Sequence, residues 1–455
     1  MASTFPANFV WGAAAASFQI EGAASEDGKG PSVWDALCRK QGAVHEGHTG
    51  DVACDHYHRW RDDVALIRSL GLKAYRLSIS WPRVMPQGAG DANEKGLSFY
   101  DKLIDGLLSA GVTPYVTLFH WDYPLALYNR GGWLSSDSPR WFADYARVVA
   151  QRLGDRVKHW MTLNEPQCFI GLGHRQGTHA PGLKLDWPDV LRAAHHSLLA
   201  HGLAVQTLRE TCKVKPSIGW APVGVVKYPA SDDPKDLDAA RAATWSAEEK
   251  SLWNNSFFSD PVCLGHYPED ALRTWGSDMP KFTAAQMKTI AQPIDFFGVN
   301  IYQGDPVRAG SNGKPERVPR APGHPVTSFG WPVEERALYW GPKFIAERYR
   351  LPVVITENGM ANNDWVSADG KVHDPQRIDF TRRYLRQLRR AIDSGVDVRG
   401  YFHWSILDNF EWAEGYSKRF GLVYVDYTTQ QRIPKDSAQW YAKVIVTNGQ
   451  ELDNV

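Results

Sequence analysis

The sequence contains few cysteines, no excess of either charge and no long apolar run. Its five cysteines are widely spaced and form no Cys-x-x-Cys pair, so the sequence predicts neither a zinc site nor a disulfide framework, and it favours a reducing compartment. The 51 Lys and Arg residues balance 51 Asp and Glu residues, which argues against nucleic acid or an anionic membrane as a partner. No apolar run is long enough to span a membrane.

The sequence also lacks internal divisions. No Ser/Gly-rich linker, low-complexity tract or repeat of roughly 20–50 residues interrupts it. Average domain size would divide the chain into roughly three domains, but α/β barrels run past roughly 400 residues as one unit. We therefore expect a single barrel domain over residues 1–455. The first strand is expected to start at Phe9, which leaves no room for a signal peptide and predicts a cytoplasmic protein.

Aromatic residues, in contrast, are abundant, with 19 Trp, 18 Tyr and 18 Phe. Most of them are expected in a large hydrophobic core. Sugars present apolar C–H faces that stack on aromatic rings, while the Trp N–H and the Tyr O–H still form hydrogen bonds. The composition therefore fits a carbohydrate ligand as well as an aromatic core.

Two glutamates stand where buried strands are predicted to end. In the stretch 353–359 (VVITENG), a short apolar run bounded by breakers predicts a buried parallel strand, which leads into Glu357. The stretch 157–166 (VKHWMTLNEP) repeats this design and leads into Asn164 and Glu165. In an α/β barrel this end of a strand faces the active site. Either glutamate alone could cap the next element, but two of them are the pair that a glycosidase requires.

Strand-like and helix-like patterns alternate along the chain. Alternation of this kind predicts a parallel sheet with right-handed crossovers, and eight repeats predict closure into a (β/α)8 TIM barrel with long active-site loops. The eight strands are expected at 9–12, 73–80, 112–120, the run ending at Glu165, 215–222, 293–302, 353–356 and 398–406. Helices are expected at 59–70, 97–111, 138–154, 187–210, most of 230–292, 333–350 with a break near 341–342, and 374–395. Long loops are expected at 171–182 and 303–332.

The polar and aromatic residues near these strand ends form a recognisable set. They are Gln19, Arg76, His120, Trp121, Asn164, Glu165, Asn300, Tyr302, Glu357 and Trp404, with Glu411 and Trp412 in the loop beyond the last strand. In a closed barrel these positions converge on one pocket. The set includes neither a Gly-rich phosphate loop nor a metal-binding motif, so no cofactor or metal is expected. Amides, an imidazole and flat aromatic rings suit an uncharged, polyhydroxylated ligand.

The sequence resembles glycoside hydrolase family one, the retaining β-glucosidases, over essentially its whole length. The motifs that carry the resemblance are FVWGAAAASFQIEG, YRLSISWPR, TLFHWDYP, TLNEP, GVNIY, ITENG, HWSILDNFEW, and YVDY with KDSAQWY. TLNEP and ITENG together are the most specific. The resemblance implies hydrolysis of terminal non-reducing β-D-glucosyl residues from cello-oligosaccharides and from aryl or alkyl β-glucosides. It also implies a covalent glycosyl-enzyme and no cofactor.

The resemblance also implies roles for individual residues. Glu165 is expected to be the acid/base and Glu357 the nucleophile. Arg76 and Tyr302 are expected to bond Glu357 and keep it anionic. Asn164 and Asn300 are expected to contact the sugar 2-hydroxyl and the nucleophile. The residues expected to hold the sugar are Gln19, His120, Trp404, Glu411 and Trp412, with Trp121 either beside the sugar or packed behind it. The leaving-group side is expected to involve Gln167, Phe169, His179, Phe329 and Trp331, for which loop packing is an equally simple interpretation.

Other functions remain to be weighed. A 6-phospho-β-glucosidase of this family usually carries Ser where Glu411 stands, and a myrosinase-type thioglucosidase lacks the acid/base that Glu165 provides. A non-catalytic sugar-binding relative would be expected to lack one carboxylate. An aldolase- or isomerase-type barrel would need a Schiff-base Lys, a metal or a phosphate loop at a strand end. Broad action on β-galactosides or β-fucosides stays open, as does the oligomeric state.

Overall fold

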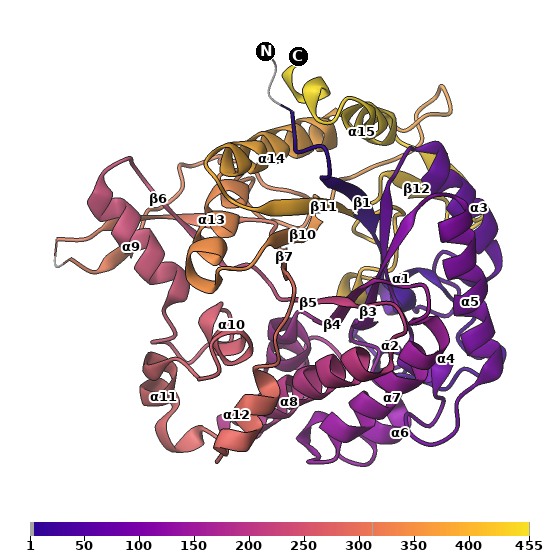
Figure 1. Ribbon diagram of the computed structural model, residues 1–455. Coiled ribbons are helices and arrows are strands. Elements are labelled where there is room, and N and C mark those ends of the chain that lie inside the picture. Colours follow the sequence, from indigo (N-terminus) through magenta and orange to yellow (C-terminus); the bar gives the residue numbers. More distant parts are fainter. Residues whose placement is uncertain (1–3, 312, 455) are drawn as a thin grey trace.

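Eight parallel strands form a barrel at the centre of the molecule, as the sequence predicted (Figure 1). The computed structural model describes residues 4–311 and 313–454. In their order around the barrel the strands are β5 (Ser217–Ala221), β4 (His159–Asn164), β3 (Thr113–Phe119), β2 (Ala74–Ser78), β1 (Val10–Ala14), β11 (Val398–Trp404), β10 (Val353–Asn358) and β7 (Phe297–Asn300). Strands β2 and β10 are buried along their whole length, because side chains fill the barrel inside and helices cover it outside.

The barrel closes between β5 and β7 through a short seam. The amide of Asn300 donates to the carbonyl of Pro222 at 3.0 Å, and the amide of Gly224 donates to the carbonyl of Asn300 at 2.8 Å. The two strands approach closely because β7 carries Gly298, where a Cβ atom would clash with the carbonyl oxygen of Trp220. The seam thus relies on a few hydrogen bonds at the carboxyl ends of the two strands rather than on a full ladder.

Helices surround the barrel on the outside (Figure 1). The longer ones are α3 (His56–Ser69), α5 (Glu94–Ser109), α7 (Ser138–Leu153), α8 (Trp187–Thr211), α13 (Ala337–Tyr349), α14 (Pro375–Asp393) and α15 (Asp436–Val446). Between β5 and β7 lie α9 (Pro234–Trp245), α10 (Ser256–Cys263), α11 (Glu269–Trp275) and α12 (Ala284–Ile290), as the helical pattern predicted. Short helices are α1 (Ser17–Ile20), α2 (Val33–Cys38), α4 (Trp81–Val84) and α6 (Leu125–Tyr128). Among the described helices, none is both long and apolar enough to cross a membrane.

Helix α14 illustrates how the sequence places these helices. Its first residue is a proline, which suits the first helical turn because that turn needs no amide donor. Phe380, Tyr384 and Leu388 recur every four residues and are buried against the barrel.

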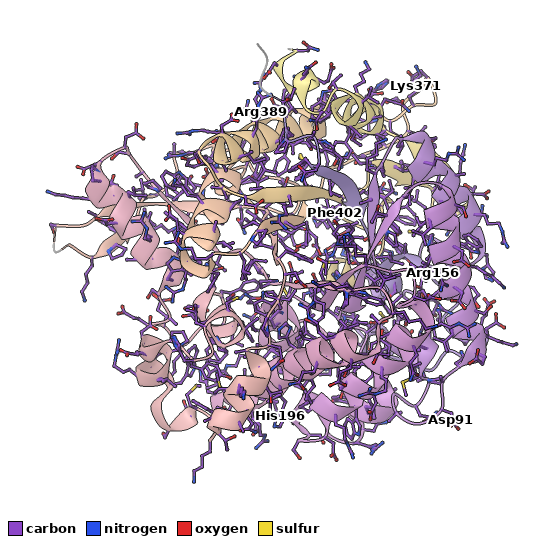
Figure 2. All side chains as sticks on the ribbon, viewed as in Figure 1. Asp91, Arg156, His196, Lys371, Arg389 and Phe402 are labelled. Carbon is purple, nitrogen blue, oxygen red and sulfur yellow. The ribbon has the colours of Figure 1, made fainter. Side chains whose placement is uncertain are left out.

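Apolar side chains lie inside the barrel and charged ones outside it. Phe402 lies at the centre of the molecule, whereas Asp91 and Lys371 lie at its periphery (Figure 2).

Two of the predicted irregular segments are ordered differently from expectation. The expected loop at 171–182 begins inside a wide helix, η3 (Gln167–Gln176). The expected loop at 303–332 contains β8 (Gly304–Ala309) and β9 (Pro315–Arg317). Strand β8 pairs with β6 (Val226–Pro229) on one side and with β9 on the other, in a separate three-stranded sheet. These strands were not predicted because their Gly/Pro-rich, polar sequence becomes a sheet only by pairing with a distant segment.

Helix α13 also departs from the prediction. It runs without a break from Ala337 to Tyr349 although it contains Gly341 and Pro342. A Cβ atom at Gly341 would clash with Ile301, so the glycine permits close packing against the segment after β7. Packing therefore outweighs the helix-breaking tendency of this pair. The small β12 (Val423–Val425) and β13 (Arg432–Pro434) pair and α15 were likewise not predicted.

Candidate active site

The carboxyl ends of the barrel strands surround a cleft of about 640 Å³, within the range of roughly 300–1,000 Å³ that is usual for ligand sites. The predicted residues that line it are His120, Trp121, Glu165, His179, Asn300, Tyr302, Phe329, Trp331, Glu357, Trp404, Glu411 and Trp412. Gln19, Arg76 and Asn164 are fully or almost fully buried, and each bonds a residue of this lining.

Glu357 is the most firmly held carboxylate of the cleft. It lies in β10 and is buried, with one carboxylate oxygen accepting a hydrogen bond from the guanidinium of Arg76. Its other oxygen accepts from the hydroxyl of Tyr302 at 2.7 Å. Burial raises the pKa of Glu357, and Arg76 and Tyr302 oppose that rise because they stabilise the ionised form. These partners favour a negative charge at Glu357.

Glu165 is held differently. It follows β4 with a φ of 45°, in the left-handed region, which turns its side chain out of the strand direction and into the cleft. One carboxylate oxygen accepts from the amide of Asn300 at 2.8 Å, and the other accepts from the thiol of Cys168 at 3.3 Å. Burial, followed by the charge of Glu357, raises the pKa of Glu165 to about 8. Glu165 therefore takes up a proton more readily than an ordinary glutamate.

A continuous set of hydrogen bonds joins the two glutamates. The amide of Asn300 that bonds Glu165 also donates to the side-chain oxygen of Asn164 at 3.0 Å. Arg76 donates to that same oxygen at 2.6 Å with one nitrogen and bonds Glu357 with another. The two carboxylates are thus joined by three side chains, which come from β2, β4 and β7.

His120 and Trp404 provide a neutral wall of the cleft. Burial, together with Arg76, lowers the pKa of His120 well below its usual value, so the imidazole is neutral. Its Nε2 accepts from the amide of Asn164 at 3.1 Å, which assigns the ring proton to Nδ1. The ring lies parallel to that of Trp404, at 5.7 Å between centroids. His120 and the indole therefore present flat faces and a donor without a charge.

Gln19 and Glu411 meet on the same side. The side-chain nitrogen of Gln19 donates to Asn409 at 3.0 Å, to the carbonyl of Phe410 at 2.9 Å and to Glu411 at 3.3 Å. The buried carbonyl oxygen of the Gln19 side chain has no hydrogen-bond partner among the described residues. Burial, followed by Glu357 and Glu165, raises the pKa of Glu411 to about 8. This corner offers acceptors for ligand hydroxyls.

Comparisons with known proteins agree with this geometry. The model of glycosyl hydrolase family 1 matches residues 1–450. The chain belongs to glycosyl hydrolase family 1. It is therefore a glycoside hydrolase with a TIM barrel, which confirms the resemblance and the fold expected from the sequence.

Relatives of known name cover nearly the whole of this family 1 chain. It is 47% identical to a 1,4-beta-D-glucan glucohydrolase of Thermotoga neapolitana, over 98% of this chain and 99% of the relative. It is 46% identical to beta-glucosidase A of Thermotoga maritima, with the same coverage. The solved structure of a family 1 β-glucosidase from Thermotoga maritima superimposes with a TM-score of 0.89 over 98% of both chains, at 46% identity.

The residues predicted for the leaving-group side of the family 1 site separate into two groups. Phe329 and Trp331 stack at 4.4 Å and line the cleft beside Tyr302, and His179 lines it next to Trp121, at 5.6 Å between ring centroids. The indole of Trp121 donates to the carbonyl of Asn164 at 2.9 Å and also borders the cleft.

Gln167 and Phe169 do not line the cleft, contrary to expectation. Gln167 bonds the main chain of Val223, and Phe169 packs edge-on against Phe119 at 5.1 Å. The reason is the helix η3, which directs both side chains away from the cleft and leaves Cys168 facing it. The predicted loop would not have imposed this arrangement, in which Cys168 faces the cleft and its two neighbours point away from it.

Several lining residues of this family 1 cleft were not predicted. They are Cys168, Leu172, residues 223–227, Trp253, residues 303–305, Arg317, Arg320, Pro332 and Phe420. The residues after β5 stand at the same edge as the other strand ends, so the strand-end rule could have found residues 223–227. The same rule could have found Cys168 after β4 and Gln303 after β7. Residues farther from the strand ends, such as Trp253 and Arg320, carry no local signal, because tertiary packing alone brings them to the cleft.

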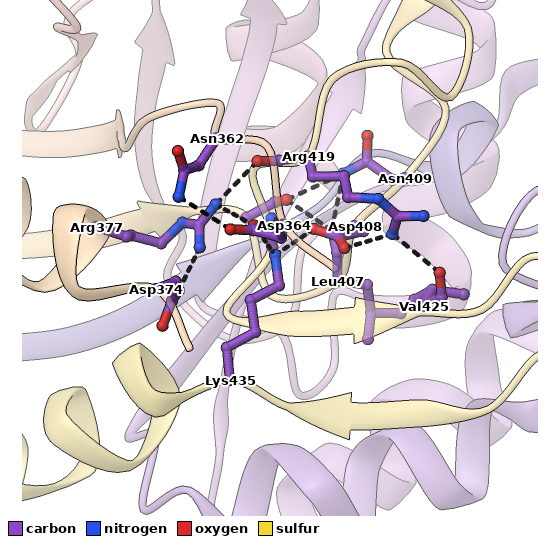
Figure 3. A network of polar contacts seen from close by, with 12 residues as sticks. Asn362, Asp364, Asp374, Arg377, Leu407, Asp408, Asn409, Arg419, Val425 and Lys435 are labelled. Carbon is purple, nitrogen blue, oxygen red and sulfur yellow. Dashed lines mark hydrogen bonds and ion pairs between the residues drawn. The ribbon is translucent and has the colours of Figure 1, made fainter. Parts of the chain in front are cut away.

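A buried network of charges holds the loops that carry part of the family 1 site (Figure 3). The ammonium group of Lys435 donates to Asp364 at 2.6 Å and to Asp408 at 2.7 Å. Asp364 follows β10, and Asp408 stands three residues before Glu411. The network therefore connects the loops that follow two neighbouring barrel strands. Within the described residues, no group of three or more His, Cys, Asp or Glu side chains is arranged to hold a metal ion.

Proposed function

We propose that this chain is a retaining β-glucosidase that releases terminal non-reducing β-D-glucosyl residues from cello-oligosaccharides and from aryl or alkyl β-glucosides. Family membership and the names of the relatives support this function. Solved structures of the Thermotoga maritima enzyme, which this chain resembles, contain small molecules such as glucoimidazole, castanospermine and deoxynojirimycin. Small β-glucosides are therefore the expected partners of the cleft.

The proposed reaction proceeds by two displacements. Glu357 attacks the anomeric carbon while the bond from that carbon to the leaving oxygen breaks, and Glu165 gives its proton to that oxygen. The carboxylate of Glu165 then takes a proton from water, whose oxygen bonds the anomeric carbon as Glu357 leaves. Two inversions at one carbon retain the β configuration.

The observation that carries this proposal is the unequal treatment of the two glutamates. Arg76 and Tyr302 stabilise the ionised form of Glu357, whereas Glu165 has only neutral donors and a pKa raised to about 8. The two carboxyls therefore carry one proton between them near neutral pH, and the proton belongs to Glu165.

The sugar side favours an uncharged glycosyl group. The charge of Glu357 contributes to the raised pKa of Glu411, so a 6-phosphate bound beside Glu411 would meet that negative charge as well. This argues against a 6-phospho-β-glucosidase. A Bifidobacterium breve relative named as a bifunctional β-D-glucosidase/β-D-fucosidase is 41% identical, less than the relatives named for glucosides alone. Glucosides are therefore the favoured substrates.

Replacement of the nucleophile tests the proposal. Glu357→Gly should lose nearly all activity on aryl β-glucosides, while circular dichroism shows an intact fold. Azide should restore turnover and yield the α-glucosyl azide, because a small anion can occupy the place of the lost carboxylate. Proton NMR of the wild-type reaction should show the β anomer of glucose first. Release of the α anomer first, or near-normal activity of Glu357→Gly, would overturn the mechanism.

A further inference from the structure

Charges of opposite sign line the inner and the outer parts of the cleft. The inner part contains three acidic side chains, Glu165, Glu357 and Glu411, of which Glu357 is held ionised by Arg76 and Tyr302. The outer part is built by the sheet of β6, β8 and β9, which projects beside the barrel near α9 (Figure 1). This sheet and the segment after it bring three cations to the cleft, Lys227, Arg317 and Arg320.

One carboxylate, Asp305 of β8, is shared by all three cations. It lies 2.6 Å from the ammonium of Lys227, 2.9 Å from Arg317 and 3.0 Å from Arg320. Burial would raise the pKa of Asp305, but the three cations prevail and lower it, so the carboxylate stays ionised. Arg320 also pairs with Glu334 at 2.8 Å. Three cations against two carboxylates leave one positive charge unbalanced at the cleft.

Lys227 and Arg317 are the two cations that remain available to a ligand. In the described part of the chain, Asp305 is the one carboxylate that pairs with either of them. Their side chains are 27% and 64% exposed, whereas that of Arg320 is 17% exposed and also donates to a carbonyl. An ammonium has three donors and a guanidinium five, so both groups keep free donors.

An aromatic surface accompanies these charges. Trp253 lines the same cleft and is 40% exposed, although it is among the largest apolar side chains of the protein. Leu172, Val223 and Val225 line the cleft as well. An exposed indole beside aliphatic side chains offers a flat face on which an aromatic ring can pack.

We propose that the outer cleft is a leaving-group subsite for aryl aglycones that bear a carboxylate. Lys227 and Arg317 bind the carboxylate, and Trp253 packs against the aromatic ring. This inference rests on the proposed β-glucosidase function and names the substrate class of that site. The charge separation decides the orientation, because an anion in the inner part would meet the negative charge of Glu357, whereas in the outer part it balances the excess cation. A second neutral sugar would make no use of that charge.

A matched pair of substrates tests the proposal: 4-carboxyphenyl β-D-glucoside and its methyl ester. The measured quantity is the ratio of kcat/KM for the acid to kcat/KM for the ester, in wild type and in Lys227→Gln/Arg317→Gln. The phenol released from the methyl ester is intrinsically the better leaving group. The test is therefore the change in the ratio between wild type and the double variant, not the ratio itself. We expect the ratio to fall on the order of three- to tenfold in the double variant. In wild type it should also fall at about 1 M salt, where charges are screened within about 3 Å.

Two controls separate the possible outcomes. Arg308→Gln removes a cation from strand β8 of the same sheet, but Arg308 pairs with Glu316 and does not line the cleft, so the ratio should stay at its wild-type value. Trp253→Ala should weaken both aryl substrates without changing the ratio. If the ratio is equal in wild type and in the double variant, the subsite proposal is wrong. Hydrolysis of the ester by wild type would in that case still support the β-glucosidase function. Failure of wild type to hydrolyse either substrate overturns the proposed function itself.

Discussion

Glu165 has two hydrogen-bond donors of unequal strength at its two carboxylate oxygens. The amide of Asn300 is an ordinary donor, whereas the thiol of Cys168 is a weak one. Burial, reinforced by Glu165, raises the pKa of Cys168 well above its usual value, so the sulfur keeps its proton and remains a donor. A thiol that bonds the charged form of Glu165 holds the pKa of that acid lower than burial alone would place it.

The pH dependence of kcat/KM should report this contact. Glu165 must be protonated to act as the acid, so activity on substrates with poor leaving groups is present below about pH 8 and is lost as the pH rises through that value. Cys168→Val removes a donor to the carboxylate and should move this alkaline limb to higher pH. Cys168→Ser keeps a donor and should leave the limb in place or lower it.

A substrate with a very good leaving group provides the control for this experiment. Dinitrophenyl β-glucoside needs no proton for the first displacement, so its kcat/KM should lack the limb that Glu165 causes. Identical limbs for wild type, Cys168→Val and Cys168→Ser would show that the thiol does not act on Glu165.

At the scale of elements, the buried ion network fixes loops against one another. Its members are Asp364, Asp374, Arg377, Asp408, Arg419 and Lys435, three carboxylates and three cations. All except Arg419 are fully buried, so removal of one partner leaves a charge without compensation in a medium where it is poorly solvated. The network lies between the loop after β10 and the loop after β11, and it holds the segment that leads to Glu411.

We expect Lys435→Met to be costly in two ways. The variant should lower the free energy of unfolding by about 3–5 kcal/mol, the usual cost of breaking a buried ion pair, and differential scanning calorimetry should show a lower midpoint. It should also lower kcat/KM, because Asp408 is no longer held near Glu411. Arg308→Gln, which breaks a solvent-exposed pair, should leave the midpoint nearly unchanged. A Lys435→Met protein with the wild-type midpoint would contradict the structural role of the network.

The elements also show what sequence reasoning could reach. The strands that carry Glu165 and Glu357 were predictable because a short apolar run, its bounding residues and the following glutamate are all local features. The sheet of β6, β8 and β9 was not, because its pairing joins segments about 80 residues apart and its sequence resembles a loop. Phe169 and Gln167 were misplaced for a related reason: the direction of a side chain after β4 depends on η3, whose wide turns leave no clear period.

At the scale of the whole molecule, the two described ends of the chain bond each other on the side of the barrel away from the cleft. The amide of Phe5 donates to the carbonyl of Asn448 at 3.1 Å, and the indole of Trp11 donates to the side chain of Asn448 at 3.0 Å. The hydroxyl of Tyr441 in α15 donates to the carbonyl of Gly12 at 2.9 Å. The start of β1 is thus tied to the final helix, and the cleft lies at the opposite ends of the strands.

The β5–β7 seam should be the first part of the barrel to open. Local opening follows the weakest set of contacts, and this seam has few main-chain hydrogen bonds compared with the paired ladders of β1 to β4. Hydrogen–deuterium exchange followed by mass spectrometry should show faster exchange in peptides that cover 217–224 and 295–302 than in one that covers 113–119. Equal protection of all three would show that the barrel opens as one unit.

The same seam links heat damage to catalysis. Asn300 closes the seam with its main chain and donates to Glu165 with its side chain, so each fluctuation that parts β5 from β7 also weakens a hydrogen bond to the acid/base of the proposed mechanism. On warming, the protein should therefore lose activity at a lower temperature than it loses helical ellipticity at 222 nm. A tightly bound glucose mimic that bridges the cleft should bring the temperature curves of activity and of ellipticity together. The highest temperature at which this enzyme works is thus set by the contacts of Asn300.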